Sequence, residues 1–348
     1  MKKNILYAGI LLGFFACGNG GENTDAKTDE TNADSTNNAT ALIEKSKGIF
    51  GELPKQAVNP ENEITEAKVI LGKTLYYDNR LSKDQTQSCN TCHNLETYGV
   101  DNNSFSLGDD TKTFGGRNSP TVLNAALHVA QFWDGREPDV EAQAGGPILN
   151  PAEMNIPSEQ FLIDRLTKVE EYTPLFADAF PGEETPLTYD NIKKAIGAFE
   201  RTLITPSRFD DFLNGDATAL NEQEQKGLET YISVGCITCH SGNNLGGTMF
   251  QKFGLFADYA PLTNSKKIDF GKFDLTQNEA DKFIFKVPSL RNIEKTNPYF
   301  HDGSVADLKE AVQIMAKTEL NKELSEEELG DIVAYLNSLT SDFTMSNN

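Results

Sequence analysis

The sequence predicts a mostly α-helical protein of about two domains, with long loops and little β structure. Apolar residues recur at three-to-four spacing in several segments, which is typical of amphipathic helices, whereas strand-like runs are sparse. The 348 residues, 38% of them hydrophobic, are enough for two buried cores. The mean hydropathy of −0.45 excludes a protein with many membrane spans.

Acidic residues dominate the charge of the chain. Lys and Arg total 31 against 52 Asp and Glu, a formal net charge of −21. A nucleic-acid-binding protein needs a basic stripe to neutralise phosphate, so this class is excluded. The charge favours a partner that is itself basic.

The amino terminus has the pattern of an export signal. Two lysines precede an apolar run over residues 5–15, which is too short to span a bilayer and typical of a signal-peptide core. Ala16 before Cys17 resembles a lipoprotein cleavage site, although Phe14 stands where Leu is usual. We therefore expect a lipoprotein signal peptide at 1–16 and lipidation of Cys17. Ordinary cleavage that leaves a free cysteine is the alternative.

The segment after this signal is polar. Residues 18–41 contain no apolar side chain larger than Ala, so they cannot bury enough surface to offset their ordering entropy. We expect a lipidated cysteine and disordered tether at 17–45. The folded part is then expected on the periplasmic side of a bacterial membrane, held there only by the lipid anchor.

The folded part should be built from helices with recognisable starts. Apolar periodicity and capping residues mark them. The expected helices are Asn62–Asp78, a helix from Thr188 to Leu203, a helix after the capping box Asn221–Glu224, and a terminal helix after the capping box Ser325–Glu328. Phe283–Val287 is the best strand candidate, and Asn102–Pro120 and Ser241–Ala280 are expected to be long loops.

Four of the five cysteines lie in two copies of one motif. Cys-Asn-Thr-Cys-His occupies 89–93 and Cys-Ile-Thr-Cys-His occupies 236–240. Cys-x-x-Cys-His is the attachment signal for c-type haem: two thiols on one helical turn add to the haem vinyl groups, and the histidine ligates the iron. A redox dithiol or half a zinc site is the alternative for a bare Cys-x-x-Cys. The expected attachment residues are Cys89, Cys92, Cys236 and Cys239, and the expected iron ligands are His93 and His240.

One haem is expected in each of two domains. We expect the boundary between Ser207 and Leu220. The expected amino-terminal haem domain is 46–210, the carboxy-terminal one is 211–342, and 343–348 is a tail.

Met315 is the candidate for the sixth ligand of the second iron. It lies on a helical pattern in the second domain, before the terminal helix. A thioether ligand raises the potential of a haem and closes it to substrates. Core packing is the alternative interpretation of a methionine on an apolar helix face.

Several distinctive stretches occur in a fixed order between Thr65 and Leu339. They are Arg117–Thr121, Phe132–Arg136, Gly146–Pro147 with Asn150–Met154, Val287–Asn292 and Pro298–Gly303. Together with the two haem motifs they resemble the bacterial dihaem cytochrome c peroxidases. Related dihaem enzymes that oxidise protein side chains share much of this pattern. The resemblance implies two cytochrome c-like helical haem domains.

The resemblance also implies a division of labour between the haems. The amino-terminal haem would react with peroxide, and the carboxy-terminal haem, with His240 and Met315, would accept electrons from a donor. Trp133 matches the family tryptophan between the haems; a plain core aromatic residue is the alternative.

Gln143 and Glu153 match the pair of residues that faces the open iron in this family. A carboxylate there can move the peroxide proton, and an amide can hold the peroxide. Glu153 could instead close a capping box with Asn150, and Gln143 could be a solvated side chain.

One residue departs from the family pattern. Many members carry a histidine that blocks the resting peroxidatic iron, and here the stretch ends in Asp109. We therefore expect an iron that is five-coordinate or water-bound at rest, without reductive activation. His128 is expected to be a buried helical residue rather than a ligand, and His301 to make structural contacts.

A calcium ion and a homodimer are implied by resemblance alone. The ligands by position would be the Asn118 side chain and the backbone carbonyls of Thr296 and Pro298.

The sequence thus predicts a dihaem peroxidase that reduces hydrogen peroxide with electrons from a small, basic cytochrome c or a similar donor. A dihaem oxidase acting on an organic or protein substrate is one alternative. A non-enzymatic dihaem electron carrier with both irons closed is the other.

Overall fold

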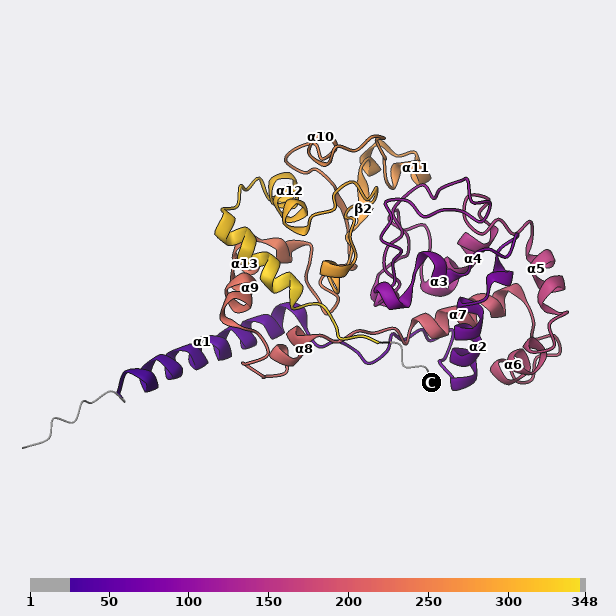
Figure 1. Ribbon diagram of the computed structural model, residues 1–348, viewed down its shortest axis with the longest axis horizontal. Helices are drawn as coiled ribbons and strands as arrows, with labels where there is room; N and C mark the ends of the chain where they lie inside the picture. The colour runs from indigo at the N-terminus through magenta and orange to yellow at the C-terminus, as the bar shows by residue number, and fades with distance from the viewer. Residues whose placement is uncertain (1–25, 345–348) are drawn as a thin grey trace, which may run out of the picture. The chain divides into compact units, whose positions relative to one another are not determined.

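A computed structural model describes residues 26–344, drawn in colour in Figure 1. These residues are mostly helical and contain one two-stranded sheet, which confirms the predicted fold class. One compact unit begins at Ala39 and contains both haem motifs. The signal peptide predicted at 1–16 and the lipidation predicted at Cys17 lie outside the described residues.

The α-helices are α1 Ala26–Phe50, α2 Glu66–Tyr76, α3 Cys89–Cys92, α4 Val140–Leu149, α5 Glu159–Leu166, α6 Tyr172–Ala179, α7 Tyr189–Glu200, α8 Arg208–Leu213, α9 Glu222–Val234, α10 Ala260–Thr263, α11 Phe273–Thr276, α12 Leu308–Leu320 and α13 Glu326–Asn337. Short 3₁₀ helices are η1 Asn79–Leu81, η2 Leu95–Thr97, η3 Ala125–Leu127, η4 Cys236–Thr238, η5 Glu279–Asp281 and η6 Ile293–Lys295. The strands are β1 Phe250–Lys252 and β2 Ile284–Lys286. A membrane-crossing helix is absent from residues 26–344, since no segment there joins the needed length to the needed apolar content.

Helix α1 corrects the predicted tether. A disordered segment was expected over 17–45, but the chain is helical from Ala26, and Leu42 and Ile43 are buried. These two residues precede Phe50 at helical spacing and pack with it in the same apolar cluster as α8 and α9. The tether prediction is therefore wrong for residues 39–45, because their apolar face has a core to bury against.

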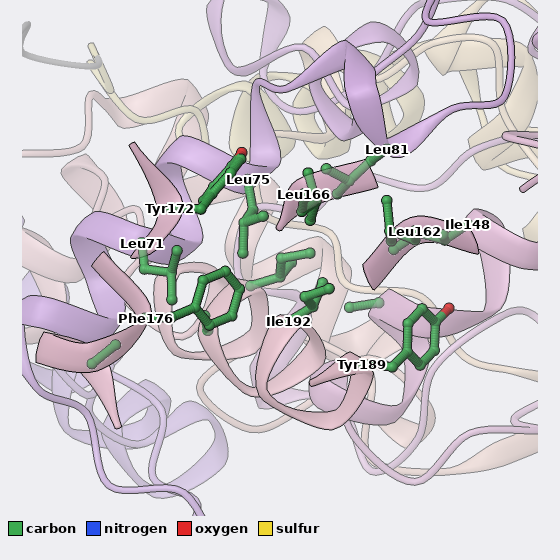
Figure 2. Packing of buried hydrophobic residues seen from close by; sticks show 14 of the residues in the cluster. Leu71, Leu75, Leu81, Ile148, Leu162, Leu166, Tyr172, Phe176, Tyr189 and Ile192 are labelled. Atoms are coloured by element: carbon green, nitrogen blue, oxygen red, sulfur yellow. The ribbon is translucent and has the colours of Figure 1, made fainter. Parts of the chain in front are cut away.

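The first core forms where α2 crosses α7, with α4, α5 and α6 around the crossing. Figure 2 shows its aliphatic and aromatic side chains pointing toward one another. Thr65 and Thr188 cap α2 and α7 by accepting from backbone N–H groups three residues on. The predicted helix at 62–78 begins later than expected because the Asn62 side-chain amide donates to Glu141 Oε1 and to the Lys194 carbonyl, both at 2.9 Å.

The second core forms where α9 crosses α13, with α8, α12 and the end of α1 against it. Both capping boxes predicted here are confirmed: Asn221 with Glu224 starts α9, and Ser325 with Glu328 starts α13. The cluster includes Phe209, Phe212, Leu228, Tyr231, Ile332, Tyr335, Leu336 and Leu339.

The two helix crossings share one geometry, which sequence reasoning missed. A Cβ at Gly72 would lie 1.9 Å from the Ala195 carbonyl oxygen, and a Cβ at Gly227 would lie 1.9 Å from the Asp331 carbonyl oxygen. In each case the glycine lets one helix touch the backbone of the other. A shared pattern that could have predicted this geometry is Gly-x-x-x-Tyr, which occurs in α2 as Gly72–Tyr76 and in α9 as Gly227–Tyr231.

The β structure is as small as expected. Strands β1 and β2 pair antiparallel, with Phe250 opposite Lys286, so the strand predicted at Phe283–Val287 is confirmed in its central part. The loop expected over 241–280 is broken by β1, α10 and α11. Strand β1 in this segment pairs with β2. Strand formation depends on contacts with residues far along the sequence, so a local pattern does not predict it.

Candidate haem sites

The first Cys-x-x-Cys-His segment forms the single helical turn α3. Ser88 and Thr91 close a capping box at its start, and His93 follows its end. Residues three apart in a helix face the same side, so Cys89 and Cys92 have the spacing that two haem vinyl groups require.

His93 is oriented for iron ligation. Its Nδ1 lies 2.9 Å from the Pro120 carbonyl oxygen, which can only accept, so Nδ1 carries the proton and Nε2 keeps its lone pair. Burial lowers the pKa of His93, which keeps the ring neutral. A neutral imidazole with a free Nε2 is what an axial haem ligand needs.

The second segment repeats this arrangement. Cys236 begins η4 and Cys239 directly follows its end, and His240 Nδ1 is 3.3 Å from the Leu245 carbonyl oxygen. Burial lowers the pKa of His240 to about 4. Gly246 has φ +130°, and a Cβ there would lie 2.1 Å from the Pro288 carbonyl oxygen, so only glycine fits against this ring.

Burial disfavours the thiolate form of all four cysteines in the two segments. Burial raises the pKa of Cys92 and of Cys236 to about 11, and it also raises the pKa of Cys89 and of Cys239. A reactive dithiol needs a lowered thiol pKa, so these surroundings do not favour one. Within residues 26–344 no group of three or more His, Cys, Asp or Glu side chains is placed to hold a metal ion, which does not favour a zinc site.

A tyrosine supports each haem histidine from the crossing helices. The Tyr76 hydroxyl donates to the His93 carbonyl at 2.5 Å, and the Tyr231 hydroxyl donates to the His240 carbonyl at 2.8 Å. These are the tyrosines of the two Gly-x-x-x-Tyr segments. The same helix crossing therefore fixes the backbone of both ligand histidines.

A cavity of about 250 Å³ adjoins the second segment. Cys236, Cys239 and His240 line it, and so does Met315 of α12. Its other walls include Tyr231, Val312, Ile332 and Leu336, which are apolar or aromatic. The residues present fit a haem, because an apolar cleft with two thiols, one imidazole and one thioether matches the donor set of a His/Met cytochrome.

Aromatic residues extend this cavity toward the first segment. Trp133 lines it and donates from Nε1 to the Asn118 carbonyl at 2.9 Å. His301 stacks on Phe285 with ring centroids 4.4 Å apart, and the Trp133 ring lies edge-on to His301. Pro120, which holds His93, lines the same cavity. The structural contacts expected of His301 are thus present.

Glu153 lies in the turn that follows α4. Burial raises its pKa, although the Arg136 charge and a hydrogen bond from Asn150 Nδ2 to Glu153 Oε1 at 3.0 Å oppose that shift. The Glu153 carboxylate also contributes to the raised pKa of Cys92, which places it within electrostatic reach of the first haem segment.

The capping-box alternative for Glu153 is wrong. Asn150 ends α4 instead of starting a helix, and its backbone N–H donates to the Gly146 carbonyl. Gln143 lies inside α4 and is half-buried.

Asp109 is buried and ties together two loops beside the first segment. Its carboxylate accepts from the Asp84 N–H and the Thr86 hydroxyl, each at 2.8 Å, and its own N–H donates to the Glu153 carbonyl at 2.7 Å. Burial by itself would raise the pKa of Asp109, but the hydrogen bonds outweigh it and the pKa is lowered. Both oxygens of the Asp109 carboxylate are therefore occupied by hydrogen bonds within the loops, which does not favour ligation of an iron.

The three residues expected to bind calcium all line the cavity of His240. They are Asn118, Thr296 and Pro298. The Asn118 side-chain N–H donates to the Asn103 carbonyl at 2.9 Å, which leaves its Oδ1 as the atom able to face a cation.

Sequence reasoning missed the partner of His128. This residue follows η3, a single 3₁₀ turn rather than the expected helix, and its Nδ1 lies 2.7 Å from Lys286 Nζ. Burial lowers the pKa of Lys286 to about 7. The two residues are 158 positions apart, so no local signal could have paired them.

Comparisons with known proteins agree with this geometry. A family model described as "Di-haem cytochrome c peroxidase" matches residues 66–218, and one described as "Cytochrome c" matches residues 224–340. The chain is 45% identical to "Cytochrome c551 peroxidase" of Nitrosomonas europaea, over 83% of this chain and 84% of that protein. It is 42% identical to the protein of the same name in Pseudomonas aeruginosa, over 87% of each.

Among solved structures, the chain resembles a "MauG-like protein associated with microbial copper homeostasis". The TM-score is 0.74 at 30% sequence identity, and the match covers 83% of this chain and 94% of that one.

Proposed function

The chain belongs to the dihaem cytochrome c peroxidase family and is a haem peroxidase, and on that premise we propose that it reduces hydrogen peroxide to water with electrons from a small cytochrome c. The balanced reaction joins one peroxide, two protons and two electrons to give two waters. One observation carries the proposal: the two haem segments have unequal surroundings. A thioether, Met315, shares the cavity of His240, whereas a half-buried carboxylate, Glu153, lies near Cys92.

We assign the iron ligands from these surroundings. His93 with Cys89 and Cys92 would hold the amino-terminal haem, and His240 and Met315 with Cys236 and Cys239 would hold the carboxy-terminal one. The haems, when bound, supply the iron centres that bind peroxide and carry electrons. The domain division between Ser207 and Leu220 is part of this proposal.

Glu153 would move the proton of the peroxide. Asn150 holds its Oε1, which leaves Oε2 as the atom that takes a proton from one peroxide oxygen and returns it to the oxygen that departs as water. Gln143 lies in the first half of α4, and its amide would donate to the peroxide and hold it in place.

We further propose that peroxide reaches the first haem without reductive activation. The loop residue that could block it is Asp109, whose carboxylate is occupied by the Asp84 N–H and the Thr86 hydroxyl. The ring of His128 is engaged at Nδ1 by Lys286. The Asp109 and His128 side chains would therefore not ligate the first iron.

Trp133 would conduct electrons between the two segments. It lines the cavity of His240 and bonds to Asn118, two residues before the proline that holds His93. A packed aromatic region between the centres suits electron transfer, since it excludes water.

The electron donor would be basic. The chain carries a formal net charge of −21, which steers a positively charged cytochrome by long-range attraction. The second-order rate with such a donor should fall as ionic strength rises, because salt screens this attraction. A rate independent of salt would contradict the steering.

Four further features remain proposals. We propose a calcium ion held by Asn118, Thr296 and Pro298, a homodimer, lipidation of Cys17, and a location on the periplasmic side of the membrane. The calcium proposal is supported by the shared cavity wall, and the last two by the signal-like residues 1–16.

A dihaem oxidase acting on an organic or protein substrate is the second candidate. The likeness to a MauG-like protein favours it. Met315 argues against it, because related oxidases often have tyrosine where the thioether stands.

The test uses the oxidised holoprotein. Electron paramagnetic resonance should show one low-spin His/Met haem and one high-spin haem, and peroxide should be consumed with a reduced cytochrome c from the first turnover. Two low-spin haems and no consumption of peroxide would indicate a non-enzymatic electron carrier. Oxidation of an organic or protein substrate without cytochrome turnover would favour the oxidase.

A further inference from the structure

Lys286 is a buried cation without an anion. Its side chain is 5% exposed, and within residues 26–344 its ammonium group has one hydrogen-bond partner, His128 Nδ1 at 2.7 Å. No carboxylate contributes to its pKa, which burial alone lowers. A lysine taken out of water needs a negative partner or loses its proton.

His128 adds a second donor to the same place. Lysine has no acceptor when charged, so the bond to Nδ1 requires that this nitrogen be unprotonated and that Nε2 carry the hydrogen. His128 Nε2 is buried and has no partner within the described residues. Lys286 and His128 together therefore present N–H groups that lack an acceptor, which is costly in a protein interior.

The backbone fixes this pair beside the cavity of the second haem segment. Lys286 ends β2, its N–H donates to the Trp133 carbonyl at 2.8 Å, and its strand partner is Phe250 of β1. On the opposite side, Gly247 has φ +77°, and a Cβ there would lie 2.2 Å from the His128 ring. Both Lys286 and His128 line the cavity that contains His240 and Met315.

We propose that Lys286 and His128 form an anion site for a haem propionate. A propionate is a carboxylate that the haem itself brings into this cavity, and it matches two buried N–H donors of which one is charged. The inference rests on the proposed function only in requiring that a haem occupy the cavity of His240. Because a cation beside a haem disfavours the more positive ferric state, the site would raise the potential of that haem.

The experiment measures the reduction potentials of both haems in the holoprotein by optical titration. Lys286→Met should lower the potential of the His/Met haem enough to shift its reduction equilibrium about tenfold, or about 59 mV for one electron. Lys286→Arg keeps the charge and should restore most of the potential. The matched control is Lys252→Met: Lys252 lines the same cavity from β1 but is exposed, so its loss should shift the equilibrium by less than about twofold.

An infrared difference spectrum of the reduced and oxidised states identifies the ligand independently of turnover. The propionate carboxylate bands should change in Lys286→Met and not in Lys252→Met. A fall in the potential of the other haem alone would also overturn the proposal, because the propionate proposed here belongs to the haem in the cavity of His240. Unchanged potentials and bands for both haems would overturn the proposal.

His128→Phe, which keeps an aromatic ring but has no N–H donor, provides a second variant if Lys286→Met fails to incorporate haem. Loss of the Nε2–H donor should shift the potential in the same direction but by less. An unchanged potential in this variant would also overturn the proposal. A protein that carries both haems but does not consume peroxide would contradict the proposed function and leave this inference intact.

Discussion

The two haem segments share a scaffold and differ in what surrounds the iron ligand. In each, a glycine brings two helices into backbone contact, and a tyrosine one turn later donates to the carbonyl of the ligand histidine. Beyond that scaffold the first segment is surrounded by Glu153 and Asp109, whereas the second adjoins an apolar cavity with Met315.

This comparison separates binding a haem from using it. The repeated crossing helices fix the histidine backbone in both halves, so they account for attachment and not for reactivity. Reactivity depends on the side chains outside the repeat. A carboxylate whose pKa is raised by burial can move protons, whereas a thioether excludes substrates.

The largest effect is expected from Glu153→Gln. The amide cannot take the peroxide proton, so kcat/KM should fall about 10²–10⁴-fold while the spectra of both haems stay unchanged. In the native enzyme kcat/KM should decline as pH falls through the pKa of Glu153, which burial raises above the ordinary range, because the protonated acid cannot act as a base. This acid limb should vanish in the variant.

Glu159→Gln is the matched control for that change. Glu159 lies in the first turn of α5 and is exposed, so its loss should leave the rate and the pH profile unchanged. Equal losses in both variants would contradict a specific role for Glu153 and would erase the chemical difference between the two halves.

Gly72→Ala and Gly227→Ala test the shared scaffold. Each methyl group would lie 1.9 Å from a backbone oxygen of the partner helix, so each variant should lose about 1–3 kcal/mol of unfolding free energy or more. Denaturant titration of the holoprotein measures this loss.

Gly330→Ala is the control for the glycine pair. Apart from the neighbouring residues of its own helix, no atom lies within 4 Å of a Cβ at Gly330 inside α13, so this variant should be neutral or more stable by up to about 1 kcal/mol. If only one of the two crossing glycines proved sensitive, the equivalence of the two scaffolds would be lost.

Asp109→Asn tests the loop that distinguishes the first half. An amide nitrogen would replace an oxygen that accepts from the Asp84 N–H or the Thr86 hydroxyl, which should cost about 1–3 kcal/mol. Because the pKa of Asp109 is lowered in the folded state, its contribution is present above the unfolded pKa and is lost as pH falls through the folded one. The variant should lack this acid-dependent loss in thermal unfolding.

Asp84→Asn serves as the comparison in the same loop. The Asp84 side chain is exposed, so its substitution should change stability by less than about 0.5 kcal/mol. An Asp109→Asn protein as stable as this control at every pH would show that the loop does not depend on the buried carboxylate.

The smallest effect is expected from Tyr76→Phe and Tyr231→Phe. Each variant removes one hydrogen bond to a histidine carbonyl, so its free energy of unfolding should fall by about 0.5–1.5 kcal/mol. The loss should be equal for the two variants. Tyr77→Phe, an exposed neighbour, should cost nothing measurable in the same thermal assay. Unequal costs would sharpen the comparison by showing which histidine depends more on its helix.

Much of the fold was predictable because its signals are local. Cys89–His93 and Cys236–His240 lie within five consecutive residues each, and the capping boxes at Asn221 and Ser325 lie within four. The tether was misjudged because Leu42 and Ile43 are too few to predict a core, and only the packing against Phe209 shows that one exists.

By itself the sequence predicted two haem-attachment segments and determined where the main helices begin. Covalent haem attachment and helix capping depend on residues that are neighbours in the sequence, so short sequence patterns predict them. Only the tertiary structure decided that Asp109 holds the Asp84 loop and that Lys286 faces His128. Asp84 and Asp109 are 25 positions apart in the sequence, and His128 and Lys286 are 158 apart. Contacts between such distant residues depend on how the helices pack, so they cannot be predicted from local patterns.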